Sequence, residues 1–189
     1  MGALRLVDAD GDGMVTLDET ESITLLSDRK DKQLSIFSYT TIKRFPEFRY
    51  FTGLTFIGTI FEGCQSLEYV ELPVYENYNG MFAKCISLQS VIIPEGVKTI
   101  GKGFCSQCIA LQLLSLPSSL ISIGSGLIWG VNGITTLLCY AITPPAVDSS
   151  LNGNPVAIYV PDESIDEYKS ASVWSSHSSI IKPLSEYIS

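Results

Sequence analysis

The sequence predicts an α+β solenoid, in which copies of one repeat stack their short parallel strands, turns and short helices on each other. Three observations favour this fold class. A pattern of Phe, Cys and Leu positions, which we call the frame, recurs every ~21 to 23 residues, and each of its first three copies ends in proline. Hydrophobic residues make up 46% of the 189 residues and charged ones 17%, enough to bury a core. Between Gly103 and Val147 the chain has no Asp, Glu, Lys or Arg, as expected where neighbouring coils cover each other.

The first element along the chain is an acidic loop, residues 8–19, which agrees with the calcium-binding EF-hand pattern at each specified place. Calcium takes about six to eight oxygen ligands, and Gly13 at the sixth place permits the sharp turn. The expected ligands are Asp8, Asp10, Asp12, the carbonyl of Met14, Thr16 and Glu19. The alternative is a solvated Asp/Gly turn. With a short exit helix over 16–26, we expect a structural calcium site in a unit spanning 1–30.

The second region, residues 31–155, contains the repeats. The frame fits residues 61–73 and 82–94, and it fits 105–117 with Cys at the Phe place, whereas a copy at 131–140 lacks both Phe and Pro. Its L-x-x-L-x-L part turns apolar residues inward and alternates as a strand does. One copy cannot bury its apolar row alone, so we expect a leucine-rich-repeat solenoid of about three good copies and a worn fourth. A sandwich of evenly spaced strands is the less favoured alternative.

The strand part of each repeat also predicts which side chains face outward. If Leu67, Val70 and Leu72 point inward, the residues between them line the outer face of the sheet. This face changes from acidic and aromatic at the first repeat to partly apolar at the fourth, and apolar strips of this kind mark contact surfaces. We expect a protein-binding strip or a homo-oligomer contact at Tyr69, Glu71, Ile92, Leu113 and Leu138. The alternative is that other parts of the full-length protein cover the strip.

The last region, residues 156–189, is predicted to cap the solenoid. Residues 157–161 have the pattern of a strand, and 162–170 that of a short capped helix. We expect Trp174 to lie over the terminal repeat, because an uncapped end would expose its apolar row. The alternative is that Trp174 and Tyr168 form an exposed platform on which sugars stack.

Taken together, these segments resemble the BspA-type leucine-rich repeats of surface proteins from Bacteroides-like bacteria. The resemblance rests on FPEFRYFTGLTFIG at 45–58, on the repeat units, and on AIYVPDESIDEYKSASVW at 157–174. The departures are Cys105 at the usual Phe place and the degenerate fourth copy. The resemblance implies a secreted or surface-displayed, non-enzymatic adhesion or interaction protein with a host or microbial protein as its partner. It also implies the calcium loop, since EF-hand or dockerin-type loops often precede such repeats.

Composition and missing motifs argue against several other functions. A net charge of −8 without a Lys/Arg cluster gives no reason to expect a nucleic-acid partner. Gly, Ser and Pro interrupt the uncharged segment too often for a membrane-spanning helix, and residues 1–6 are too short for a signal peptide, so a secreted form would be mature or trimmed. No Walker or dinucleotide motif is present, and His177 lies in a serine-rich stretch typical of a polar loop, so we expect no enzyme.

The five cysteines form an odd set, so disulfides cannot pair all of them within one chain. Cys105 and Cys108 have CxxC spacing without a second pair, which argues against a zinc site, and most of the cysteines occupy repeat places suited to small buried hydrophobes. As an alternative function we keep a carbohydrate-binding accessory protein of glycan uptake, which would show exposed aromatic side chains on one face.

Overall fold

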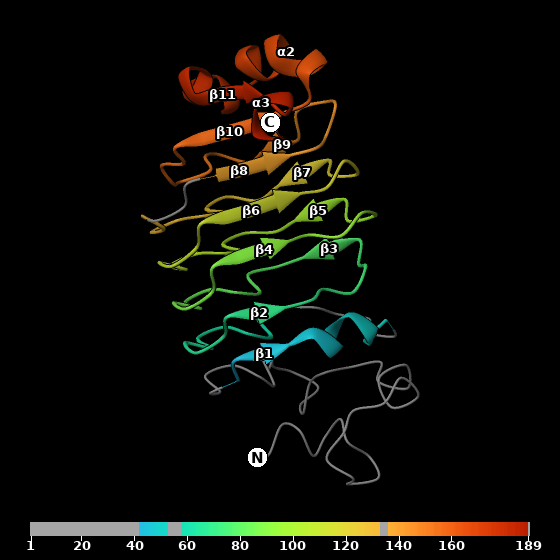
Figure 1. Ribbon diagram of the computed structural model, residues 1–189, viewed down its shortest axis with the longest axis vertical. Coiled ribbons are helices and arrows are strands. Elements are labelled where there is room, and N and C mark those ends of the chain that lie inside the picture. Colours follow the sequence, from blue (N-terminus) through green and yellow to red (C-terminus); the bar gives the residue numbers. More distant parts are fainter. Residues whose placement is uncertain (1–41, 53–57, 133–135, 189) are drawn as a thin grey trace, which may run out of the picture.

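The computed structural model describes residues 42–52, 58–132 and 136–188, which form a stack of coils (Figure 1). The coils follow one another along the long axis of the molecule, from β1 (Arg44–Phe45) near one end to α2 (Ile165–Ser170) at the other. Strands of successive coils pair in parallel, which confirms the stacked-repeat part of the predicted fold class. The N-terminal unit expected at residues 1–30, with its calcium loop, lies outside the described residues.

The principal sheet has five parallel strands in the order β11-β10-β8-β6-β4. They are β4 (Ser90–Ile92), β6 (Leu113–Leu116), β8 (Thr136–Cys139), β10 (Ala157–Val160) and β11 (Ile181–Pro183). Equivalent repeat places lie in register, so that Val91 lies beside Leu114 and Leu114 beside Leu137. Before β4, the strand β2 (Tyr69–Val70) pairs in the same sense with β1. The stack therefore includes a coil before the first clear copy of the repeat.

A second, four-stranded parallel sheet forms another side of the stack. Its strands are β3 (Asn77–Tyr78), β5 (Thr99–Ile100), β7 (Ser122–Ile123) and β9 (Ala146–Val147). The coils approach closely here, since a Cβ added at Gly124 would lie 2.6 Å from the backbone nitrogen of Lys102. Glycine is therefore required at this place for the two coils to stack.

Turns form the third side of each coil, and they also stack through backbone hydrogen bonds. The amide of Phe82 donates to the carbonyl of Phe104 at 2.9 Å, and the amide of Cys105 donates to that of Leu127 at 2.9 Å. One residue with positive φ recurs just before the second frame place of each copy; these residues are Gly63, Lys84, Gln107 and Gly130. The same left-handed residue in each turn gives the coils the same shape, so they superimpose.

Equivalent side chains of successive coils touch inside the stack and form one core. The rings of Phe61 and Phe82 stack with centroids 5.7 Å apart, and Phe82 meets Phe104 edge to face at 5.3 Å. Cys105 keeps the backbone place of Phe82, as the frame predicts, while Phe104, one residue earlier, supplies the missing ring. The aromatic column thus continues through the copy that lacks the frame phenylalanine.

Beyond the repeats, residues 156–188, which we call the C-terminal segment, fold over the last coils. After β10 come η3 (Asp162–Ser164), α2, η4 (Trp174–Ile180), β11 and α3 (Ser185–Ile188). A strand and a helix thus lie where the sequence predicted them. Tyr168 and Trp174 are fully buried, with their rings edge to face at 5.0 Å. The hydroxyl of Tyr168 donates to the carbonyl of Ala141 at 2.7 Å, and Trp174 Nε1 donates to that of Pro145 at 2.8 Å. Neither ring is an exposed sugar platform, so that alternative for these two residues is wrong.

Candidate binding surface

The outer face of the principal sheet, together with the β1–β2 pair before it, carries the side chains that the sequence assigned to a binding strip. Along one column of the register, Ile92 lies beside Ser115, Ser115 beside Leu138, and Leu138 beside Tyr159. By repeat spacing Glu71 precedes Ile92 in this column. The neighbouring column contains Tyr69 and, two coils further on, Leu113, with Ser90 between them. The strand pairing therefore brings Ile92, Leu113 and Leu138 to one face, and the repeat spacing assigns Tyr69 and Glu71 to its continuation.

The first part of this face is a network of charged and aromatic side chains. The guanidinium of Arg44 lies over the Tyr69 ring, 4.7 Å from its centroid, and the Tyr69 hydroxyl donates to Glu71 Oε1 at 2.7 Å. Arg49, from η2 (Pro46–Tyr50), forms an ion pair with Glu71 and stacks on Tyr50. These contacts hold Glu71 and Tyr69 in fixed orientations on a surface open to solvent.

Hydrogen bonding within this network shifts the pKa of its members. The bond from Arg49, followed by that from Tyr69, holds the pKa of the Glu71 carboxyl below its usual range. The bond to Glu71 raises the pKa of Tyr69, and hydrogen bonds to Tyr50 and Glu71 raise that of Arg49. At neutral pH this part of the face therefore presents an ionised carboxylate paired with the Arg49 guanidinium.

The middle of the face is apolar. Ile92 is 68% exposed, although it belongs to the strand β4 rather than to a loop, and Leu113 in the neighbouring strand is half-buried. Ser90, beside Leu113 in the neighbouring column, is small and uncharged. Of the apolar residues expected to line a strip here, Ile92 is therefore exposed and Leu113 partly exposed.

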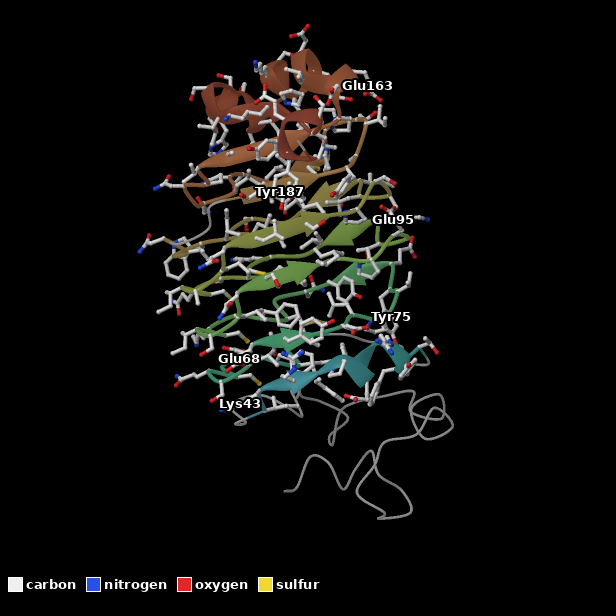
Figure 2. All side chains as sticks on the ribbon, in the orientation of Figure 1. Lys43, Glu68, Tyr75, Glu95, Glu163 and Tyr187 are labelled. Carbon is white, nitrogen blue, oxygen red and sulfur yellow. The ribbon has the colours of Figure 1, made fainter. Side chains whose placement is uncertain are left out.

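Leu138 differs from this expectation, because it is 4% exposed. Its strand register directs it outward beside Tyr159, and the Tyr159 ring contacts that of Tyr187, with centroids 5.1 Å apart. The amide of Leu184 donates to the carbonyl of Val160 at 2.8 Å, which extends the β10–β11 ladder to the residue before α3, the helix that carries Tyr187. Figure 2 shows Tyr187 close to the strands of this part of the sheet. The C-terminal segment therefore covers Leu138, and the assignment of Leu138 to an exposed strip was wrong.

The cysteines lie inside the stack and are chemically protected. All five are buried. The thiol of Cys85 donates to the carbonyl of Phe61 at 3.0 Å, and that of Cys108 to Phe82 at 2.9 Å, so the same contact repeats from coil to coil. Burial raises the pKa of Cys105 and Cys85 and raises that of Cys139 to about 11. Thiols of this kind are poor nucleophiles and metal ligands at neutral pH, as the repeat frame predicts.

The turn side of the stack contains a groove that the sequence analysis did not anticipate. It measures about 470 Å³ and is lined by residues 129–132, 150, 152–154 and 176–177. Trp129 lies in the turn after Gly126, at the edge of the groove, and is 54% exposed. Three segments far apart in the sequence form this groove, so no local motif announces it.

No candidate metal cluster of His, Cys, Asp and Glu occurs within residues 42–52, 58–132 and 136–188. The calcium ligands proposed from the sequence, Asp8 to Glu19, lie outside these residues, so their geometry is not described. Across the same described part of the chain, the helices are too short and insufficiently apolar to cross a membrane.

Comparison with known families agrees with the repeat geometry. The model of the BspA type leucine rich repeat region matches residues 33–139 with six copies, which is more than half of the chain. The match ends with the degenerate copy at Cys139 and begins before Phe45, so it contains more copies than the sequence frame identified. The early pairing of β1 with β2 is consistent with this longer array. A comparison with curated proteins finds no match.

Proposed function

The chain belongs to the BspA-type leucine-rich-repeat family, and we propose that it is a non-enzymatic protein of the cell surface or extracellular space that binds another protein. Repeats of this family are typical of protein-interaction proteins, and their members are typically surface-displayed or secreted. The binding site that we propose is the outer face of the principal sheet around Tyr69, Glu71, Ile92 and Leu113.

The observation that supports this site is Ile92, a large apolar side chain that is 68% exposed although it belongs to the regular strand β4. Beside it, the Arg44–Tyr69 and Arg49–Glu71 contacts present an ordered polar border. An apolar centre with a Tyr- and Arg-rich border is the composition of a protein-binding surface. A homo-oligomer contact would use the same residues, and light scattering of the purified chain distinguishes it from a monomer that awaits a partner.

The test is a pull-down from mucosal or serum proteins with the immobilised chain, followed by affinity measurement for each captured protein. The variant Ile92→Glu should weaken binding by about 2 kcal/mol, roughly thirtyfold, because a charge would enter the apolar centre. Ile121→Glu is the matched control, since Ile121 is also exposed but lies beside β7, away from the principal sheet. Equal affinity of the Ile92→Glu variant and the unchanged chain would exclude this face as the site.

We also propose that residues 8–19 bind calcium through Asp8, Asp10, Asp12, Met14, Thr16 and Glu19, on the basis of the sequence pattern alone. An ion that binds the native state raises its stability by about 2.7 kcal/mol at a hundredfold excess over Kd. Thermal unfolding in calcium and then in chelator measures this difference. Asp12→Ala should remove it, and an unchanged melting temperature in both solutions would contradict the site.

A further inference from the structure

The groove on the turn side lies where the regular stacking of turns ends. In the earlier coils the amides of Gly63 and Lys84 donate to the carbonyls of Ala83 and Ser106, and the amide of Gln107 donates to Trp129 at 2.7 Å. Trp129 therefore holds the place of the small residues Ala83 and Ser106. The large Trp129 side chain therefore extends from the last turn in this series of hydrogen bonds.

The next segment of the chain adds one more stacked turn, which lines a space beside Trp129. The amide of Ile128 donates to the carbonyl of Leu151 at 3.2 Å, so the loop at 150–154 lies over residues 126–128. Gly153 makes this approach feasible, since a Cβ there would lie 2.5 Å from the Ile128 side chain. The opposite wall comes from Ser176 and His177 in η4. The groove is thus a fixed consequence of how the array ends.

The groove combines one aromatic side chain with neutral polar groups. Trp129 is 54% exposed, and the amide side chains of Asn132, Asn152 and Asn154 line the same space. Asn152 is held in place, because its side chain accepts a hydrogen bond from Ser150 and its backbone amide donates to Ser150 Oγ at 2.8 Å. Each carboxamide offers both donors and an acceptor. No Asp, Glu, Lys or Arg is among the described residues that line the groove.

We propose that this groove binds an uncharged oligosaccharide, with one sugar ring stacked on Trp129 and its hydroxyl groups bonded to the asparagine side chains. A sugar ring has an apolar face of C–H groups and a rim of hydroxyls that donate and accept. An indole face surrounded by carboxamides matches both features. This site is separate from the sheet face, so the proposal does not depend on the protein-binding function.

The electrostatics of the groove favour a neutral ligand. Partial burial lowers the pKa of His177, so its imidazole is uncharged at neutral pH. One wall of the groove, residues 129–132, belongs to the segment 103–147, in which the sequence has no Asp, Glu, Lys or Arg. A charged ligand would find no opposite charge in the lining, whereas binding of a neutral one should hardly change with salt.

The experiment titrates the full chain with neutral cello-, malto-, xylo-, manno- and N-acetylchito-oligosaccharides, followed by tryptophan fluorescence and calorimetry. The chain has two tryptophans, and Trp174 is fully buried, so acrylamide quenching reports on Trp129. At least one series should protect Trp129 from quenching, with an affinity unchanged between low and high salt. Trp129→Ala should weaken binding about tenfold or more, and Asn154→Ala by several-fold.

Two control variants make the outcome decisive. Trp129→Phe keeps an aromatic face and should retain part of the affinity, and Ile121→Ala, at a distant exposed side chain, should retain all of it. The proposal is overturned if no neutral series binds, if Trp129→Ala binds as well as the unchanged chain, or if acidic sugars or peptides alone protect Trp129. Loss of partner capture in Ile92→Glu with intact sugar binding would keep the two sites distinct.

Discussion

The two halves of the outer face share one column of repeat places but differ in what covers them. In the first half Ile92 is 68% exposed and Glu71 lies in a surface network with Arg49 and Tyr69. In the second half Leu138 occupies the same column and is 4% exposed, because the end of the chain folds over it. Register therefore decides the direction of a side chain, and a distant segment decides whether that side chain reaches solvent.

The largest effect on stability is expected when Trp174, which holds the C-terminal segment on the last coils, is removed. Trp174→Ala deletes a fully buried ring, its contact with Tyr168 and its hydrogen bond to Pro145, and should lower the free energy of unfolding by about 3 to 5 kcal/mol. Trp129→Ala is the matched control and should change it by about 0.5 kcal/mol or less. Urea unfolding followed by circular dichroism measures both. Similar losses in the two variants would mean that Trp174 does not anchor the C-terminal segment.

A direct comparison within the column truncates one apolar residue in each half. Leu138→Ala should cost about 2 to 3 kcal/mol, because a buried side chain leaves a cavity, whereas Ile92→Ala should remain within about 0.5 kcal/mol. Chemical unfolding of both variants measures the two values. If Leu138→Ala were as mild as Ile92→Ala, the covered half of the face would be open in solution.

A smaller loss of stability is expected when the contact between the C-terminal segment and β10 is weakened at Tyr187. Tyr187→Ala removes the ring that contacts Tyr159 and should cost about 1 kcal/mol. Amide hydrogen exchange should speed up in β10 and β8 and stay constant in β4, which the C-terminal segment does not pair with. Faster exchange across all strands would indicate global rather than local opening.

The smallest effect concerns the exposed half and depends on pH. The folded-state pKa of Glu71 is lowered by Arg49 and Tyr69, so its contribution is present above the unfolded pKa and is lost as the pH falls through the lowered value. The melting temperature of Glu71→Gln should therefore lie slightly below that of the unchanged chain at pH 7. The two temperatures should converge in acid. A difference that grows on acidification would contradict this assignment.

Repetition explains why much of the fold could be predicted from the sequence. A fixed offset of Phe, Cys and Leu forces each coil to take the shape of its neighbours, so the inward places Leu67, Leu88 and Leu111 could be identified without coordinates and are fully buried. The frame missed the early coil at β1, where Arg44 and Phe45 pair with Tyr69 and Val70. That coil has phenylalanines without the cysteine that marks the later copies, so it gave a weaker signal.

The sequence by itself determined the repeat and the inward and outward directions of its strand residues, and it is the sole basis for the calcium site proposed at residues 8–19. These follow from spacing along the chain, and local geometry converts spacing into direction. Tertiary structure alone decided that Leu138 is covered, that Phe104 fills the ring column, and that Trp129, Asn152 and His177 share a groove. Each of these depends on contacts between segments far apart in the chain, and no spacing encodes them.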